Sequence, residues 1–233
     1  MAKSVRSWAG RALALIIALL AWYTADLAAR AWQVQRFEAS LVGLEARRSY
    51  DAAELSSIKS LADTGGAWLR PPSARLAADE LELRARWWRL LAEHSGEDAE
   101  RRRALRSARL DLEQAHALRP SWPYAAAALA EVLAAEGAFG SELQSAYRSA
   151  LARGPNEPRL LRQLLDLALA NRSRWPANLQ AEPIRIAKRL DAIDGYRLLA
   201  IASRRQALDW LCALEGLSIP VHNACKAQGF GRD

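Results

Sequence analysis

The residues able to do chemistry are few and far apart: three histidines and two cysteines in 233 residues. Cys212 and Cys225 have twelve residues between them, and Gly216–Pro220 favours a turn that would bring the thiols together. In an oxidising compartment they would form a disulfide worth about 3 kcal/mol in the chain-entropy model. The alternative is two unpaired thiols on helical segments. His222 is close by, but Cys212 is too remote for the paired-ligand spacing of zinc sites, so no metal site is predicted.

The other two histidines carry no catalytic signature. His94 lies beside a predicted turn, and His116 lies among the leucines and alanines of a predicted helix. Both are interpreted as surface or hydrogen-bonded helix histidines. The sequence also lacks a nucleophile elbow, a phosphate-cradling glycine loop and a zinc-binding helix motif. We therefore expect no catalytic residue, no cofactor and no metal ligand, and a protein that is not an enzyme.

A run of arginines is the one strong charge cluster. Arg101–Arg103, with Arg106 and Arg109, lies among five acidic residues between positions 97 and 113. Charges three and four residues apart on a helix form weak ion pairs, so this stretch is interpreted as a solvated face. The alternative is a contact with an anionic glycan or lipid.

Composition predicts the elements that hold these residues. The chain has 49 Ala and 37 Leu but only five Val, eight Ile and two Thr, which favours an all-α fold over any sizeable sheet. The net charge is +7, and the first 36 residues hold five basic groups and one acid. The rest of the chain is of mixed charge with no basic stripe interleaved with aromatics, so nucleic-acid binding is not predicted.

The N-terminal segment predicts a membrane anchor. Residues 12–25 are free of charge, and flanking aromatic and basic side chains extend this run toward the roughly 20 residues that cross a bilayer core. We expect a short basic N-terminus at residues 1–8 and a single transmembrane helix over residues 9–29. The predicted interfacial anchors are Trp8, Arg11, Trp22, Tyr23 and Trp32.

Two alternatives for this segment stay open. A cleaved signal peptide could use Ala29-Arg30-Ala31 as its site, although no helix breaker precedes it. A buried core helix is the other. Basic residues flank the apolar run on both sides, so they do not fix its orientation. Long downstream domains translocate largely regardless of such charges. We expect a single-pass protein of the bacterial inner membrane with a periplasmic C-terminal domain.

Beyond the anchor the sequence predicts helix pairs. Residues 30–72 form a juxtamembrane helical segment and linker, and residues 73–233 form the main domain with a C-terminal cap. Gly and Pro divide the main domain into helices near 74–93, 98–118, 123–136, 142–153 and 157–170. A Trp-Pro connector follows at 171–177, and then helices near 180–192 and 196–215.

The spacing of these breaks predicts a repeat. Pro120 and Pro155 are 35 positions apart, one more than the period of a tetratricopeptide (TPR) repeat. Small residues would let paired helices approach, and bulky ones would fill the space between them. One such pair cannot bury its own apolar face, so a TPR-like α-solenoid of stacked pairs is expected; a plain helical bundle is the alternative. The residues that fit the template are Pro120, Leu129, Ala130, Gly137, Tyr147, Ala150 and Pro155.

The order of these parts resembles the VpsP-type polysaccharide biosynthesis proteins of bacterial exopolysaccharide gene clusters. The resemblance rests on the apolar anchor, on residues 117–124 (ALRPSWPY), on residues 150–158 (ALARGPNEP), on the Trp-Pro connector and on a late Leu-Cys. Asn156 departs from it, since the family tends to have Trp there. The resemblance implies a non-enzymatic accessory role in making or exporting an extracellular polysaccharide, and no catalytic residues to carry over.

We therefore expect a membrane-anchored scaffold that binds other polysaccharide synthesis or export proteins through its helical-repeat surface. A general cell-envelope adaptor for secretion or division would have much the same sequence. A glycan-binding module is a third possibility, and it would expose Trp87, Trp88 or Trp122 along a groove. These tryptophans are instead interpreted as packing residues.

Overall fold

A computed structural model describes most of the chain. The described residues are 15–26, 28–29, 31–32, 35, 38–39, 41–42, 53–54, 56–57, 59–60 and 74–230, with side chains left out at 74–76. Within them every regular element is helical and no strand is present, which confirms the all-α prediction. The remaining residues, Trp8 and Arg11 among them, lie outside the described part.

The first helix pair consists of α3 (Ala74–His94) and α4 (Asp98–Leu118). Apolar residues recur along one side of each helix, and these sides face one another. The buried Asp111 of α4 accepts two hydrogen bonds from Arg84 of α3, one of them 2.6 Å from Nε. Burial raises the pKa of Asp111, although Arg84 acts in the opposite direction.

The second pair, α5 (Pro123–Ala135) and α6 (Ser141–Arg153), packs through small residues. Pro123 starts α5 at a position where its missing N–H costs nothing. Ala130 and Ala150 have no exposed surface, as their predicted roles require, whereas Leu129 is partly buried. Gly137 turns the chain between the two helices with a φ of 80°, which favours glycine.

The third pair joins α7 (Pro158–Ala170) to α8 (Ala181–Arg204), with short 3₁₀ turns η2 (Arg172–Arg174) and η3 (Ala177–Leu179) between them. Gly154 allows α7 to approach, because a Cβ there would lie 2.5 Å from Leu160 Cδ2. Asp166 of α7 accepts hydrogen bonds from the last two arginines of this region, Arg204 and Arg205.

The C-terminal region differs from the prediction in one place. A break near residue 194 was expected, and Asp194 does kink α8. A helix over 196–215 is wrong: α8 ends at Arg204, Gln206 takes a φ of 51°, and α9 covers only Leu208–Cys212. The turn buries Ala207 completely and α9 buries Leu211, so tertiary packing ends a helix that has no glycine or proline to stop it. The last helix is α10 (Ile219–Ala227).

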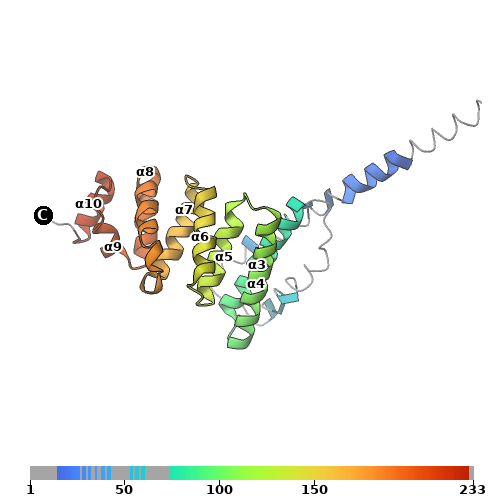
Figure 1. The fold of residues 1–233 in the computed structure, drawn as a ribbon, viewed down its shortest axis with the longest axis horizontal. Helices are drawn as coiled ribbons and strands as arrows, with labels where there is room; N and C mark the ends of the chain where they lie inside the picture. The colour runs from blue at the N-terminus through green and yellow to red at the C-terminus, as the bar shows by residue number, and fades with distance from the viewer. Residues whose placement is uncertain are drawn as a thin grey trace, which may run out of the picture.

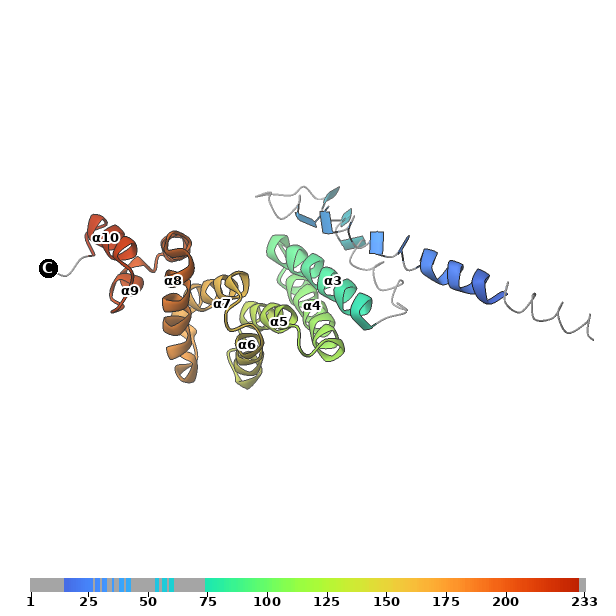
Figure 2. The same ribbon diagram turned by 90° about the horizontal axis from the view of Figure 1, so that it is seen from above.

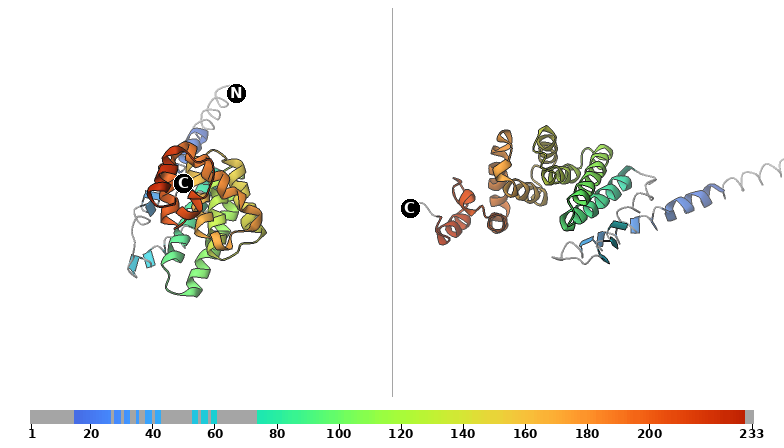
Figure 3. Two further views of the ribbon diagram at one scale, coloured as in Figure 1. Left: turned by 90° about the vertical axis from the view of Figure 1, so that its left-hand side faces the viewer. Right: turned by 90° about the horizontal axis from the view of Figure 1, so that it is seen from below.

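The helices are arranged in chain order along the long axis of the molecule (Figure 1). Viewed from above, the pairs α3/α4, α5/α6 and α7/α8 follow one another, with α9 and α10 at the far end (Figure 2). Each helix contacts its own partner most, then the next pair in sequence. The helix at residues 15–26 lies at the opposite end from the C-terminus (Figure 3).

The N-terminal residues that are described include an exposed apolar helix at 15–26 and a segment that packs on the first pair. Trp22, Tyr23 and Trp32 are all exposed. Leu41 is fully buried against the α3/α4 core, and Lys59 pairs with Glu100 of α4 at 3.0 Å. Among the described residues, no helix is both long enough and apolar enough to cross a bilayer.

Candidate functional site

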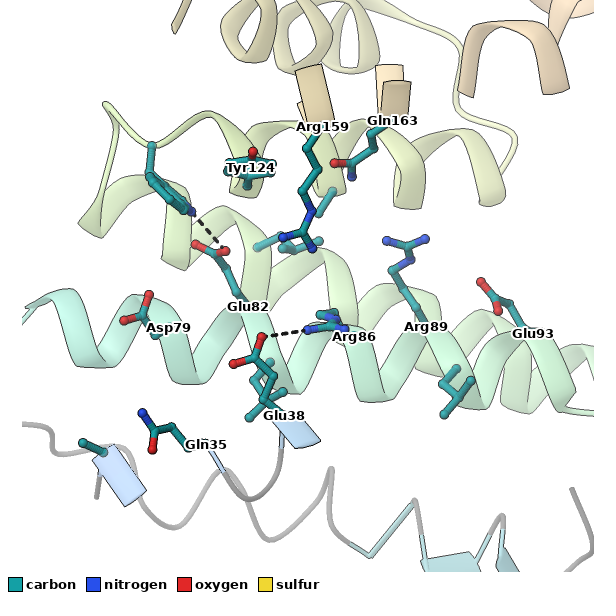
Figure 4. A pocket seen from close by; sticks show the side chains of 16 residues that line it. Gln35, Glu38, Asp79, Glu82, Arg86, Arg89, Glu93, Tyr124, Arg159 and Gln163 are labelled. Carbon is teal, nitrogen blue, oxygen red and sulfur yellow. Dashed lines mark hydrogen bonds and ion pairs between the residues drawn. The ribbon is translucent and has the colours of Figure 1, made fainter. Parts of the chain in front are cut away.

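A pocket of about 870 Å³ lies between α3, α5 and α7. We call it the α3–α5–α7 pocket. Residues 31, 35 and 38 of the N-terminal segment also line it. Polar and charged side chains from several helices converge on it (Figure 4). Those labelled in the figure are Gln35, Glu38, Asp79, Glu82, Arg86, Arg89, Glu93, Tyr124, Arg159 and Gln163.

Helix α3 contributes a polar stripe to the pocket. Its members are Asp79, Glu82, Arg86, Arg89 and Glu93, at alternating steps of three and four residues. This spacing keeps side chains on one face of a helix, one above the other. The opposite face of α3 packs on α4, so the fold leaves the stripe to form one wall of the pocket.

Trp122 and Tyr124 bring two aromatic rings to one end of this stripe. Both flank Pro123 at the start of α5, and their ring centroids are 5.1 Å apart. The indole N–H of Trp122 donates a hydrogen bond of 3.3 Å to Glu82 Oε2. The guanidinium of Arg119 lies 4.2 Å from the Trp122 ring centroid, a cation–π contact that covers part of the ring.

Glu82 has one carboxylate oxygen without a partner. Its Oε1 atom is buried and receives no hydrogen bond within the described part of the chain. Desolvation by burial raises the pKa of Glu82, which the bond from Trp122 and the charge of Arg119 only partly offset. A buried polar atom left unpaired costs roughly 1–3 kcal/mol, so a donor that reached this oxygen would stabilise the carboxylate.

Beyond Glu82 the stripe continues with two arginines and ends at the acidic Glu93. Arg86 pairs loosely with Glu38 of the N-terminal segment at 3.7 Å, and Arg89 is hydrogen-bonded to Glu131 of α5. Arg159 extends from α7 toward Arg86 and lies 5.7 Å from the centroid of Tyr124 (Figure 4). The pocket therefore presents a carboxylate with aromatic rings at one end and guanidinium groups along its middle, between Glu82 and Glu93.

The side chains that line the pocket are suited to binding a charged segment. They are carboxylates, guanidiniums, aromatic rings, two amides and several aliphatic side chains, and none of the described lining residues is Ser, Cys or His. Across the described residues, no group of His, Cys, Asp and Glu is arranged to hold a metal ion. Charged and aromatic groups that face a common space are the usual means of recognising a charged segment.

The cysteines and histidines singled out by the sequence are not among the described residues that line this pocket. Cys212 and Cys225 form a disulfide between α9 and α10, with Cα atoms 5.6 Å apart. His94 Nδ1 lies 3.0 Å from the Leu90 carbonyl at the end of α3. The His116 Nδ1 is buried without a partner among the described residues, and burial together with Arg153 lowers the pKa of this histidine.

The arginine run is largely exposed to solvent. Arg101–Arg103 and Arg106 are exposed on the first half of α4. Arg109 forms the predicted type of helical pair with Glu113, at 2.8 Å, and also reaches Glu142 of α6. None of these five arginines lines the α3–α5–α7 pocket.

The three tryptophans considered for sugar stacking differ in how far they are buried. Trp87 is buried in the α3/α4 core and Trp88 is half-buried beside it. Trp122 alone is exposed, at 38%, and lines the pocket. Sequence reasoning missed Glu82, Tyr124 and Arg159. The alternating spacing of charges along residues 79–93 was the signal that would have found the α3 wall.

No protein-family model, curated protein or solved structure matches this chain.

Proposed function

We propose that this protein is a non-enzymatic, membrane-anchored scaffold that holds a polypeptide segment of a partner in the α3–α5–α7 pocket. The observation that carries the proposal is the convergence of charged and aromatic side chains from three separate helices on one open pocket. Such a site binds a segment that presents several side chains at once. The serial order of the helix pairs supports the TPR-like solenoid, since stacked pairs leave one helix of each pair facing a shared groove.

The cellular role follows the sequence resemblance. We propose that the scaffold acts in bacterial exopolysaccharide biosynthesis or export, tethered at the inner membrane through residues 9–29 with its C-terminal domain in the periplasm. The exposed apolar side chains at residues 15–20 support an anchor, because they lack a protein surface to cover them among the described residues. The Cys212–Cys225 disulfide supports the periplasm, because disulfides persist in oxidising compartments.

The test is to block the pocket. Ala128 lines the pocket on α5, so Ala128→Trp would fill it, whereas Ala152→Trp places the same side chain on an exposed site of α6. A chromosomal deletion in the source bacterium is complemented with each variant, and secreted polysaccharide is measured. We expect no rescue by Ala128→Trp and full rescue by Ala152→Trp, with equal levels of both proteins by immunoblot.

Two results would contradict the proposal. Rescue by both variants would show that the pocket is not used. Unchanged polysaccharide secretion in the deletion strain would place the scaffold in another envelope process, such as secretion or division. A reporter fusion at residue 233, read with one enzyme active only in the periplasm and one active only in the cytoplasm, tests the topology separately.

A further inference from the structure

The α3–α5–α7 pocket has two neighbouring parts of opposite charge, and a ligand must satisfy both. Glu82, beside Trp122 and Tyr124, forms an acidic part, which suits a cation. Arg86 and Arg159 form a basic part, which suits a carboxylate. Resting on the function proposed above, we propose that the pocket binds an extended peptide with a lysine or arginine two residues from an aspartate or glutamate.

The cation of the ligand is assigned to Glu82 because Oε1 of this carboxylate accepts no hydrogen bond from the described residues. Oε2 already accepts the Trp122 N–H, so Oε1 is the atom left for the ligand. A lysine ammonium or an arginine guanidinium would supply the missing hydrogen bond and neutralise the buried charge. Trp122 donates to the same carboxylate and Tyr124 lies against Trp122, so the ring edges would contact the aliphatic stem of the same side chain.

The carboxylate is assigned to Arg159 with Arg86. Arg159 contacts the Tyr124 ring and has no carboxylate partner within the described residues. Arg86 is held by Glu38 at 3.7 Å, and Glu38 is 58% exposed, so this ion pair is of the weak, solvent-screened kind. A ligand carboxylate that bridges the two guanidiniums would compete with Glu38 for Arg86.

The spacing in the ligand comes from the spacing on α3. Glu82 and Arg86 are four residues apart, a rise of about 6 Å at 1.5 Å per residue. In an extended peptide, side chains two residues apart lie on one face, about 6.6 Å from each other. A basic and an acidic residue with one residue between them would therefore meet Glu82 and Arg86 at once, in either chain direction.

Other ligand classes fit less well. A polyanion such as a nucleic acid would meet four carboxylates in the same pocket, contributed by residues 38, 79, 82 and 93. A sugar ring needs an open aromatic face, and Trp122 already has Arg119 over it and Tyr124 against it. The mixed lining is best matched by a mixed-charge peptide.

A display experiment tests the inference with a defined probe. The full chain in detergent micelles is used to select from a random nonapeptide library displayed on phage. We expect enriched peptides to carry a basic and an acidic residue two positions apart. The leading peptide is then synthesised, and its dissociation constant is measured by fluorescence anisotropy against the protein and its variants.

Double-mutant cycles assign each end of the peptide. Glu82→Gln keeps the shape and the acceptor for Trp122, and we expect binding to weaken about tenfold or more. In that variant, replacing the basic residue of the peptide with glutamine should have no further effect. Arg159→Gln should behave likewise toward the acidic residue. Glu97→Gln and Arg101→Gln, at exposed sites outside the pocket, are the matched controls.

The outcomes separate this inference from the function on which it rests. Enriched peptides without the charge pair would overturn the ligand assignment, and so would double-mutant cycles in which the losses of binding free energy simply add. If Ala128→Trp still abolished the binding of such peptides, the pocket would remain a peptide site. Failure to enrich any peptide, or binding that Ala128→Trp leaves unchanged, would overturn both. Binding of a neutral oligosaccharide that Trp122→Ala abolishes would replace the peptide with a glycan.

Discussion

Removing the ring of Tyr147 should strongly destabilise the domain. Tyr147 is fully buried and meets Trp175 edge to face, with ring centroids 5.1 Å apart. Replacing a buried aromatic ring with alanine costs about 3–5 kcal/mol. For a chain of this size, that corresponds to a fall in melting temperature of roughly 6–20 °C.

The hydroxyl group should matter far less than the ring. Tyr147 Oη donates to the Leu164 carbonyl over 3.5 Å, at the limit of a hydrogen bond. Tyr147→Phe removes this contact and leaves the ring, so we expect a loss below about 1 kcal/mol. The assay is thermal and urea unfolding of the full chain in detergent, followed by circular dichroism at 222 nm, for wild type, Tyr147→Phe and Tyr147→Ala.

The comparison between the two variants decides the reasoning. Equal destabilisation by both would show that the polar contact, and not ring packing, holds α6 to α7. A melting temperature of Tyr147→Ala within 2 °C of wild type would show that the ring is not packed in a core that joins α6, α7 and the connector.

Three further results are expected. Replacing both Cys212 and Cys225 with serine should destabilise α9 and α10 by about 3 kcal/mol, because the disulfide no longer restricts a loop of this length in the unfolded chain. The measurement is hydrogen exchange, which should become faster only in residues 208–227. Faster exchange across the whole chain would contradict this expectation. Gly154→Ala should cost about 1–3 kcal/mol in urea unfolding by overpacking. Gly96→Ala, with no atom within 4 Å of the new Cβ, should lower stability far less, and equal losses would refute the overpacking argument. Burial pushes the pKa of Asp166 upward, but hydrogen bonds from the two arginines at the end of α8 outweigh it and hold the pKa below its ordinary value of 3.8. The ionised form therefore stabilises the fold above pH 3.8, so Asp166→Asn should lower the melting temperature at pH 7. The difference in melting temperature between wild type and variant should become smaller as the pH falls below 3.8. A difference that does not change with pH would show that the charge is not involved.

Sequence reasoning located the helices that end at glycine or proline. The predicted ranges 74–93, 142–153 and 157–170 agree with α3, α6 and α7 to within one residue, because these breaks act locally on the backbone. The end of α8 could not be found in this way. Gln206 takes a left-handed conformation that its residue type does not favour, and the burial of Ala207 by neighbouring helices is not visible in the sequence.

The candidate site was visible only in part. From the sequence, Trp122 is interpreted as a packing residue, with sugar stacking as the alternative, and nothing pairs it with Glu82. Its hydrogen bond to Glu82 joins residues 40 positions apart, and Arg159 comes from a further helix pair. Such a site depends on how pairs pack on one another, which the helical period within each segment does not encode.

The local character of the contacts has a consequence for how the chain acquires its structure. Each pair closes contacts between helices adjacent in sequence, and the two cysteines are 13 positions apart. Proteins dominated by such short-range contacts fold quickly, and domains made from the N-terminus onward can acquire order during synthesis. The α3/α4 pair would thus be in place before α7 is made, and oxidation of the last loop would need only its own two short helices.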